Sequence, residues 1–507
     1  MYNSPILVPP ANTDYLTDAA ITAAVERLLR TNRGVTPHLV EVTTHDGVVA
    51  LSGYADSLLA RQRTEEIARA VRGVRGVISR LVIQPANVPD EELQRDLEHA
   101  LTADPATEEY RVRCAVAGGV VTLHGTVQSW PEKQLVLRVL SGVRGIRKIE
   151  AKKLRVRGGE IMNSDEEITT QIRELLDWDI RVNGPLVTVR TADRTVYLAG
   201  TVGTAAGKAR VVATAYQAGA ARVDARDLLV TCGPLNRRSR RDTFAPRPDA
   251  AVAQAVRDSL SYAPGMLLSE PLVQVHEGVV TLAGTVGSLR AKQAAERDAR
   301  LVVGVANVHN LLKVRPGSVV TDANICQAVG AALARDPYVS HREFSVRARE
   351  GKVCLGGQAG SYFEWKQIGE VAAGVKGVLD VENRVEIAAP EAAPPEPNPA
   401  GFQEFLPGED APNPQPQEVD HALASRIRTR YFWSAALHDQ DVEVQVEDGR
   451  ATLSGTVDTW LDRQQAARDA YEAGARDVNN HLRVTTAPWL ALVAREPTAP
   501  LLTAGAP

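Results

Sequence analysis

One short phrase occurs six times in this chain, and it constrains the possible folds more than any other feature of the sequence. Each copy combines a turn pair, a run rich in β-branched residues, a small residue and a closing glycine. The copies read DGVVALSG (46–53), GGVVTLHG (118–125), DRTVYLAG (193–200), EGVVTLAG (277–284), EGKVCLGG (350–357) and DGRATLSG (448–455). They recur about every 70–100 residues, which is longer than a usual solenoid repeat, so each copy can belong to a small domain of its own.

The residues around each phrase predict the same order of elements in every copy. In the first copy, apolar residues at helical spacing predict an amphipathic helix over 18–29, and alternation predicts a strand over 39–43. The Asp-Gly pair suits a type I′ turn, and the closing glycine permits an unusual backbone angle or a close helix approach. A second helix over 57–72 and a last strand at 81–83 follow. We therefore predict an α+β fold: six tandem α-β-β-α-β modules, each a three-stranded mixed sheet covered by two helices on one face.

These features resemble the BON domain, the bacterial osmotic-shock and nodulation module. Besides the six phrases, Gly-Val endings at 73–74, 142–143, 304–305 and 374–375 carry the resemblance. The third and sixth copies depart from it with Gly219-Ala220 and Gly474-Ala475, and the third has Arg194 in place of its turn glycine. We expect altered hairpins in these two copies.

The resemblance covers most of the chain and implies its division into domains, with BON-like modules 1 to 6 in chain order. The expected modules span 14–85, 89–157, 164–232, 249–316, 321–388 and 418–486, an Arg/Pro linker spans 233–248, a Pro-rich linker spans 389–417, and a tail spans 487–507.

The six copies are not equally alike, which indicates that a three-module unit was duplicated. The shared motifs are Ser-Leu-x-Ala-(Arg/Lys)-Gln at 57–62 and 288–293, Ala-Leu-x-x-Asp-Pro at 100–105 and 332–337, and Ala-Tyr-x-Ala-Gly-Ala at 215–220 and 470–475. The three modules of each half should therefore pack in the same way. Trp178 and Trp433 should occupy equivalent sites, and we expect a core role for them rather than a ligand-facing one.

Composition narrows the classes of partner and compartment. A formal net charge of −4 gives no reason to expect a nucleic-acid partner. The four cysteines, Cys114, Cys232, Cys326 and Cys354, show no CxxC spacing, so we interpret them as buried thiols in a reducing compartment rather than as disulfides or metal ligands. The N-terminus has no signal-peptide pattern, and no apolar run approaches the roughly 20 residues that span a bilayer. We expect a soluble, cytoplasmic protein.

A dense positive cluster in the Arg/Pro linker is the candidate site for an anion or a lipid headgroup. It contains Arg237, Arg238, Arg240 and Arg241. Basic clusters of this kind bind anionic lipid or phosphate. The alternative is a solvated loop whose arginines pair with nearby carboxylates.

No catalytic motif is visible in the sequence. The segment 203–208 (GTAAGK) departs from a P-loop, because it has three residues between its glycines and Ala209 after its lysine. His124 and His276 lie in predicted strands, where a structural histidine is the usual explanation. We expect no cofactor, no metal site and no enzymatic activity.

The resemblance implies a role in osmotic or envelope stress and attachment to phospholipid surfaces. The leading hypothesis is a non-catalytic, multivalent binding protein that attaches to a phospholipid surface or a cell-envelope component. Several weak modules on one chain bind more tightly than one. Without an export signal, the inner face of the membrane would be the relevant surface. The alternative is a structural scaffold that self-assembles or recruits a protein partner through open strand edges.

Overall fold

The chain forms six small mixed sheets, each with two helices, in the predicted order of elements. The computed structural model describes residues 16–32, 34–157, 164–231, 247–261, 271–317, 320–387 and 416–484. The predicted fold class is confirmed.

The first half of the chain contains modules 1 to 3. Module 1 contains α1 (Asp18–Thr31), β1 (Val40–His45), β2 (Val48–Ala55), α2 (Leu58–Ala70), β3 (Gly76–Ser79) and β4 (Val82–Ile83). Module 2 contains α3 (Asp90–Ala103), β5 (Arg111–Ala117), β6 (Val120–Val127), α4 (Trp130–Ser141) and β7 (Lys148–Val156). Module 3 contains α5 (Asp165–Trp178), β8 (Val187–Ala192), β9 (Thr195–Val202), α6 (Ala205–Gln217) and β10 (Arg222–Val230).

The second half contains modules 4 to 6. Module 4 contains α8 (Asp249–Ser261), β11 (Leu272–His276), β12 (Val279–Val286), α9 (Leu289–Arg300) and β13 (Asn307–Val314). Module 5 contains α10 (Asp322–Arg335), β14 (Phe344–Arg349), β15 (Lys352–Ala359), α11 (Tyr362–Ala373), β16 (Asp380–Asn383) and β17 (Glu386–Ile387). Module 6 contains α12 (Pro416–Trp433), β18 (Asp441–Glu447), β19 (Arg450–Val457), α13 (Trp460–Glu472), β20 (Asp477–Asn480) and β21 (Arg483–Val484).

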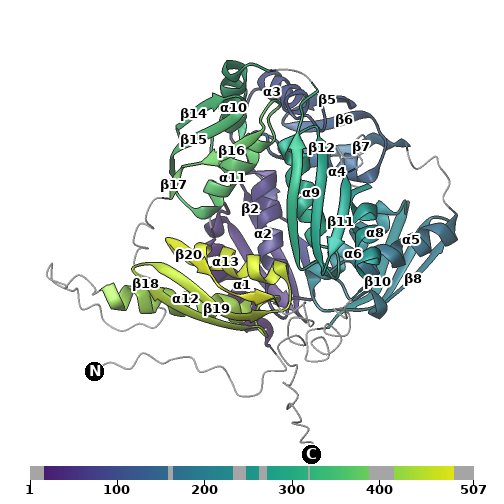
Figure 1. Ribbon diagram of the computed structural model, residues 1–507, viewed down its shortest axis with the longest axis vertical. Helices are drawn as coiled ribbons and strands as arrows, with labels where there is room; N and C mark the ends of the chain where they lie inside the picture. Colours follow the sequence, from purple (N-terminus) through teal and green to yellow (C-terminus); the bar gives the residue numbers. More distant parts are fainter. Residues whose placement is uncertain are drawn as a thin grey trace, which may run out of the picture.

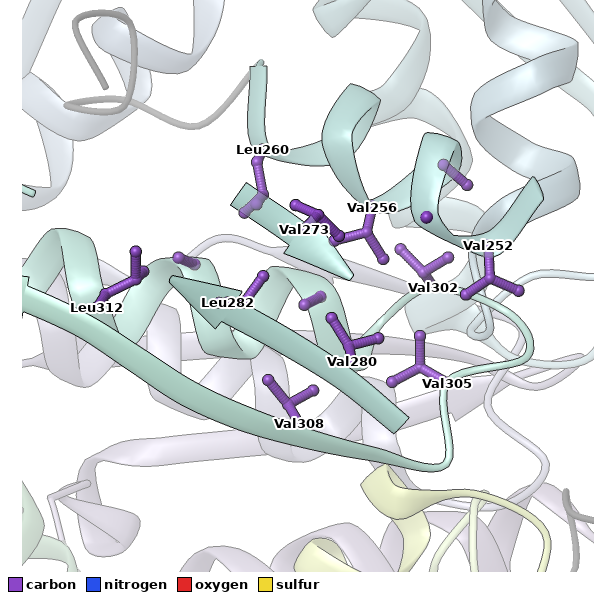
Figure 2. Packing of buried hydrophobic residues seen from close by; sticks show 14 of the residues in the cluster. Val252, Val256, Leu260, Val273, Val280, Leu282, Val302, Val305, Val308 and Leu312 are labelled. Atoms are coloured by element: carbon purple, nitrogen blue, oxygen red, sulfur yellow. The ribbon is translucent and has the colours of Figure 1, made fainter. Parts of the chain in front are cut away.

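The repeated phrase forms the central strand of every sheet. It pairs antiparallel with the strand before it through the hairpin and parallel with the strand after the second helix, as β12 does with β11 and β13. Alternate residues of this strand are buried, which places one face against the two helices. Figure 2 shows the result in module 4, where Val280 and Leu282 meet valines from α8 and β13.

The glycines that close the six phrases all have positive φ, and in four modules a Cβ would also clash with the carbonyl oxygen of a residue at or just before the start of the first strand. Gly53 has φ +107°, and a Cβ at this position would lie 2.0 Å from the carbonyl oxygen of Leu39. The predicted unusual backbone angle is confirmed. The close approach is that of Leu39, which ends a short 3-10 helix (Pro37–Leu39) leading into β1, and not of α1 or α2.

An aspartate near the N-terminal end of the first helix holds the hairpin turn in all six modules, and it is the first helical residue in five of them. The Asp18 carboxylate accepts the backbone N–H groups of Asp46 and Gly47, both at 2.8 Å, and the turn begins 28 residues after this aspartate. The same pair of bonds, at the same spacing, is made by Asp90, Asp165, Asp249, Asp322 and Asp420. The hydrogen bond from Gly47 is the main reason that the pKa of Asp18 lies below its usual value.

The expectation of altered hairpins in modules 3 and 6 is wrong. Asp193 and Arg194 have φ +49° and +57°, which resembles Asp448 and Gly449 at +50° and +72°. All of these are the positive angles of a two-residue type I′ turn. The turn keeps this shape without glycine because Asp165 accepts the N–H groups of Asp193 and Arg194 at 2.8 and 2.9 Å.

The modules pair across the two halves, as module 1 with 6, 2 with 5, and 3 with 4. Figure 1 shows module 6 lying beside module 1, so that the chain closes on itself. The second helices of neighbouring modules also pack on one another: α2 and α4 each contact α6, and α11 contacts α9 and α13.

Two reciprocal backbone hydrogen bonds join each pair. In pair 1–6, Arg72 N–H donates to the Trp433 carbonyl at 2.8 Å, and Ala435 N–H donates to the Ala70 carbonyl at 2.9 Å. In pair 3–4, the Val303 N–H donates to the Trp178 carbonyl and the Ile180 N–H to the Leu301 carbonyl, both at 2.9 Å. In pair 2–5, the Arg144 N–H donates to the Arg335 carbonyl at 3.0 Å, and the Lys376 N–H donates to the Ala103 carbonyl at 3.1 Å. Each donor or acceptor follows or ends a helix, where backbone groups lack intrahelical partners.

The predicted equivalence of the halves is confirmed at several side chains, but not in all helix contacts, because the packing of α2 on α6 and of α9 on α11 has no equally extensive counterpart in the other half. Trp178 packs on the core of module 4, and Trp433 packs on the core of module 1. Both tryptophans therefore have the predicted core role at equivalent sites, but each serves the core of its paired module. Equivalent ring stacks also join the last two modules of each half, Trp130 with Tyr216 and Tyr362 with Tyr471.

Candidate functional site

The outer face of the module 2 sheet carries a concentration of positive charge. We call it the basic face and define it by Arg111, Arg113, His124, Lys153 and Arg155. Across the strands, His124 pairs with Arg113 on one side and Lys153 on the other, and Thr126 pairs in the same way with Arg111 and Arg155. The alternation of the strands explains why all five point outward, because Cys114, Leu123 and Leu154 between them are buried in the core.

The cations of the basic face are available to a ligand. Arg111, Arg113, Lys153 and Arg155 are exposed, and His124 is half-buried. Among the described residues, none of these four cations forms an ion pair within 4 Å. Lys148, at the other end of β7, does pair with Glu150 at 2.6 Å. The pKa of that glutamate is lowered mainly by the hydrogen bond from Lys148, with smaller effects of Lys152 and Lys153.

A hollow of about 710 Å³ lies where β5 begins and β6 ends, beside the basic face. Arg111, Arg113, His124 and Arg157 line it together with Glu109 and Glu132. The Glu132 carboxylate is already used, because it accepts the N–H of Gln128 at 2.6 Å at the start of α4. This hollow therefore offers three guanidinium groups, which suit a phosphate or carboxylate ligand.

Module 5, the counterpart of module 2 in the other half, lacks most of this charge, and the arginine it keeps beside β15, Arg384, is paired with Glu382. Ser345 stands where module 2 has Arg113, and Glu386 stands where it has Arg155. Strand β16 of module 5 also carries two acidic residues, Asp380 and Glu382. The basic face is thus a property of one module and not of the repeat.

A cleft of about 1430 Å³ lies between modules 1, 3 and 6. Arg69, Arg181 and Arg210 line it, but all three are bound by carboxylates: Arg69 by Glu65, and the other two by Asp179. The cleft also contains Asp18, which holds a hairpin turn. These charged groups of the cleft therefore already form ion pairs or hydrogen bonds within the protein.

The structure does not describe the predicted site residues. Arg237, Arg238, Arg240 and Arg241 lie outside the described residues, as does Cys232. The segment 203–208 forms the start of α6, where the Thr204 hydroxyl accepts the Gly207 N–H at 2.9 Å and caps the helix. His124 and His276 lie in strands as predicted, but both lie on outer sheet faces, so neither is a core histidine.

A readable signal for the basic face was missed in the sequence. Residues 147–157 read RKIEAKKLRVR, with six cations and one acid. Alternation within a strand places Lys153 and Arg155 on one face, and the hairpin adds Arg111 and Arg113 beside them. Only the pairing register, which sequence alone does not show, brings these two groups together.

The described groups give no sign of a reactive centre. Burial raises the pKa of the Cys114 thiol to about 11, which suppresses the nucleophilic thiolate. Cys326 and Cys354 are unpaired and half-buried. In the described part of the chain, no three residues among His, Cys, Asp and Glu gather in a way that could hold a metal ion, and no helix there combines the length and apolar character needed to cross a bilayer.

Comparison with known proteins agrees with the repeat. The family model for the BON domain matches residues 17–85, 89–158, 164–230, 248–316, 321–389 and 419–486. Osmotically-inducible protein Y of Escherichia coli (strain K12) is 26% identical over 144 residues, which cover 27% of this chain and 72% of that protein.

Solved structures give only a weak likeness. Two chains of CdsD, a structural protein of the type III secretion system of Chlamydia trachomatis, are 15% and 14% identical. The matches span 48% and 45% of this chain, and 97% and 100% of the two CdsD chains. Their TM-scores of 0.12 and 0.11 support no inference about this chain.

Proposed function

Because this chain belongs to the BON domain family, with six copies along most of its length, we propose that it is a non-catalytic, stress-related protein that attaches to an anionic phospholipid surface. The name of its relative, an osmotically inducible protein, supports the stress-related part of this proposal. The surface proposed for it is the inner face of the membrane, with the protein bound peripherally from the cytoplasm.

The basic face is the observation that carries the lipid proposal. A lysine or arginine near an anionic bilayer contributes about 1 kcal/mol of attraction. Arg111, Arg113, Lys153 and Arg155 lie on two neighbouring rows of one sheet face, so they can meet a flat anionic surface together. Their summed attraction is about 4 kcal/mol, enough for reversible binding that falls as salt rises.

Vesicle flotation tests this proposal. The wild-type chain should float with vesicles rich in phosphatidylglycerol at low salt and remain unbound with phosphatidylcholine vesicles. The quadruple variant Arg111→Gln, Arg113→Gln, Lys153→Gln, Arg155→Gln should bind anionic vesicles roughly 1000-fold more weakly, because four attractive charges are lost.

A matched control comes from the equivalent module. Arg347→Gln with Arg349→Gln removes two exposed cations of β14 in module 5 and should leave flotation nearly unchanged. If the wild-type chain fails to bind anionic vesicles, the lipid proposal is wrong. If the quadruple variant binds as well as wild type, the basic face is not the membrane contact.

Apolar side chains on two other outer faces favour a second candidate, recruitment of a protein partner. Leu272 and Leu311 flank Ala283 in one row of the module 4 sheet and are 58% and 61% exposed. Tyr54 and Val82 pair on the module 1 sheet and are 43% and 55% exposed. Light scattering distinguishes the two candidates: a chain that is monomeric and indifferent to lipid leaves partner recruitment as the surviving function.

A further inference from the structure

We propose that each three-module half is an association unit whose partner is the complementary half, so that the chain is a pair of subunits joined by one linker. Every backbone hydrogen bond between modules in the described part of the chain joins one half to the other. There are two at each of the pairs 1–6, 2–5 and 3–4. The association therefore does not depend on the connection between modules 3 and 4.

The three pairs follow a twofold pattern. Module 2 donates from Arg144 to Arg335 of module 5, and module 5 donates from the equivalent residue, Lys376, to Ala103 of module 2. The twofold rotation that exchanges modules 2 and 5 also exchanges pair 1–6 with pair 3–4. Such reciprocal contacts are the mark of a C2 dimer interface, in which one patch meets its own equivalent.

Side chains add ion pairs across pair 2–5 and its surroundings. Asp104 of module 2 is 4% exposed and binds the guanidinium of Arg290 from module 4. Lys376 of module 5 binds Glu108 of module 2 at 2.6 Å. Both contacts cross from one half to the other.

Within a half, the modules have contacts of their own. Trp130 stacks on Tyr216 in the first half, with centroids 6.1 Å apart, and Tyr362 stacks on Tyr471 in the second, at 4.3 Å. These equivalent stacks join modules 2 and 3 and modules 5 and 6, which keeps each half a defined partner for the other.

The two halves differ in charge near the centre, which favours pairing of unlike halves. Arg138 in α4 lies within electrostatic range of Glu370 and Asp298 of the second half, and its pKa is lowered mainly by partial desolvation and then by the like charges of Arg297 and Arg290. Glu370 occupies the position in module 5 that Arg138 occupies in module 2. In a pair of two first halves, Leu59 would stand in place of Arg290, so the buried Asp104 would lose its guanidinium partner. This loss favours pairing of a first half with a second half over pairing with its own copy.

Cleavage of the folded chain between the halves tests the proposal. A protease site is inserted into the 232–246 segment, the full chain is purified intact, and cleavage is followed by native mass spectrometry. We expect both fragments to remain in one particle at roughly micromolar concentration, as expected for specific interfaces. Separation of the wild-type fragments at that concentration would overturn the proposal.

Variants at the interface sharpen the test. Arg290→Ala leaves Asp104 buried without its guanidinium, so the cleaved halves should associate roughly tenfold to 100-fold more weakly. Arg257→Ala is the matched control, because Arg257 is exposed and binds Gln254 of its own helix. Equal association of the Arg290→Ala and Arg257→Ala chains would contradict the proposed interface.

A second variant covers the case in which Arg290→Ala fails to fold. Lys376→Glu places like charges at a partly exposed contact and should weaken association of the halves roughly fivefold. Adding Glu108→Lys restores an opposite pair and should recover association. Failure of this rescue, with both chains folded by circular dichroism, would count against the interface.

Discussion

Pairs 1–6 and 3–4 have the same backbone contacts but different buried charges. In pair 3–4, Asp179 of module 3 accepts from Arg181 and Arg210 of the same module, each at 2.7 Å. In pair 1–6 the equivalent positions are Ser434, Ala436 and Gln465, and no such cluster can form.

Pair 1–6 has its own network at other positions. Arg430 of module 6, 9% exposed, binds Asp469, Glu472 and the Asn32 side chain of module 1, and Arg63 of module 1 binds Glu472 at 2.9 Å. Module 3 has Leu175, Thr214 and Gln217 where module 6 has Arg430, Asp469 and Glu472. The backbone geometry is thus common to the two interfaces, while each has a separate set of ionic partners. This difference makes the interfaces non-interchangeable.

Arg430→Leu should have the largest effect, because it places the module 3 residue in module 6 and leaves Asp469 and Glu472 buried without their shared partner. Removing one member of a buried ionic network costs about 3–5 kcal/mol. Urea unfolding should show this loss. The triple variant Arg430→Leu, Asp469→Thr, Glu472→Gln copies the whole module 3 set and should be less destabilised than the single variant. A triple variant that is equally unstable would mean that the network is not a unit.

Asp179→Ser makes the reverse exchange in pair 3–4. It leaves two guanidinium groups without a carboxylate, and because both are about one-third exposed, the expected loss is about 2 kcal/mol. Arg181 and Arg210 hold the pKa of the buried Asp179 at about 2, below its usual value. The stabilisation by Asp179 is therefore complete above pH 4 and disappears as the pH falls through about 2. Ser434→Ala at the equivalent site is the control and should change stability little.

Pair 2–5 differs from pair 3–4 in the direction in which a buried carboxyl group makes the stability of the chain depend on pH. Asp336 of module 5 is equivalent to Asp104, but Leu59 stands where Arg290 would be needed, and burial raises the Asp336 pKa to about 6. A raised carboxyl pKa stabilises the folded chain at low pH, and this contribution is lost as the pH rises through about 6. Stability should fall by about 2 kcal/mol between pH 4 and pH 7. In Asp336→Asn this part of the pH dependence should be absent, and an unchanged slope would show that another group is responsible.

The smallest expected effect concerns the hairpins of modules 3 and 6. Arg194→Gly removes a side chain from a residue with φ +57° and should stabilise the chain by at most about 1 kcal/mol. The gain is reduced because the Arg194 side chain donates to the Gly219 carbonyl at 3.2 Å. Gly449→Arg in module 6 is the reciprocal change and should destabilise by a similar amount in thermal unfolding. A stabilising Gly449→Arg would contradict the assigned turn strain.

The module fold was predictable because its signals are local. The alternation around Val49 and Leu51, the turn pair and the closing Gly53 all act within one hairpin. The aspartate 28 residues before each turn was also readable in all six copies, from Asp18 to Asp420, but its meaning depends on a helix start that meets the hairpin in space.

The candidate site and the interfaces were harder to predict. The basic face combines Arg113 with Lys153, 40 positions later in the chain, through a strand pairing that no local pattern specifies. The partner of Trp178 lies in the next module, whereas the partner of Trp433 lies at the opposite end of the chain. Duplication predicted that their sites are equivalent, yet not which module each tryptophan contacts.

Native-state hydrogen exchange tests the pairing of the halves most directly. The amides of Arg72, Arg144, Ile180, Val303, Lys376 and Ala435 follow helices and would be open to solvent in separate modules. The paired architecture predicts that all six are protected together and become exposed in one cooperative opening. Exchange at the rate of free loop amides, in modules that remain folded, would contradict it.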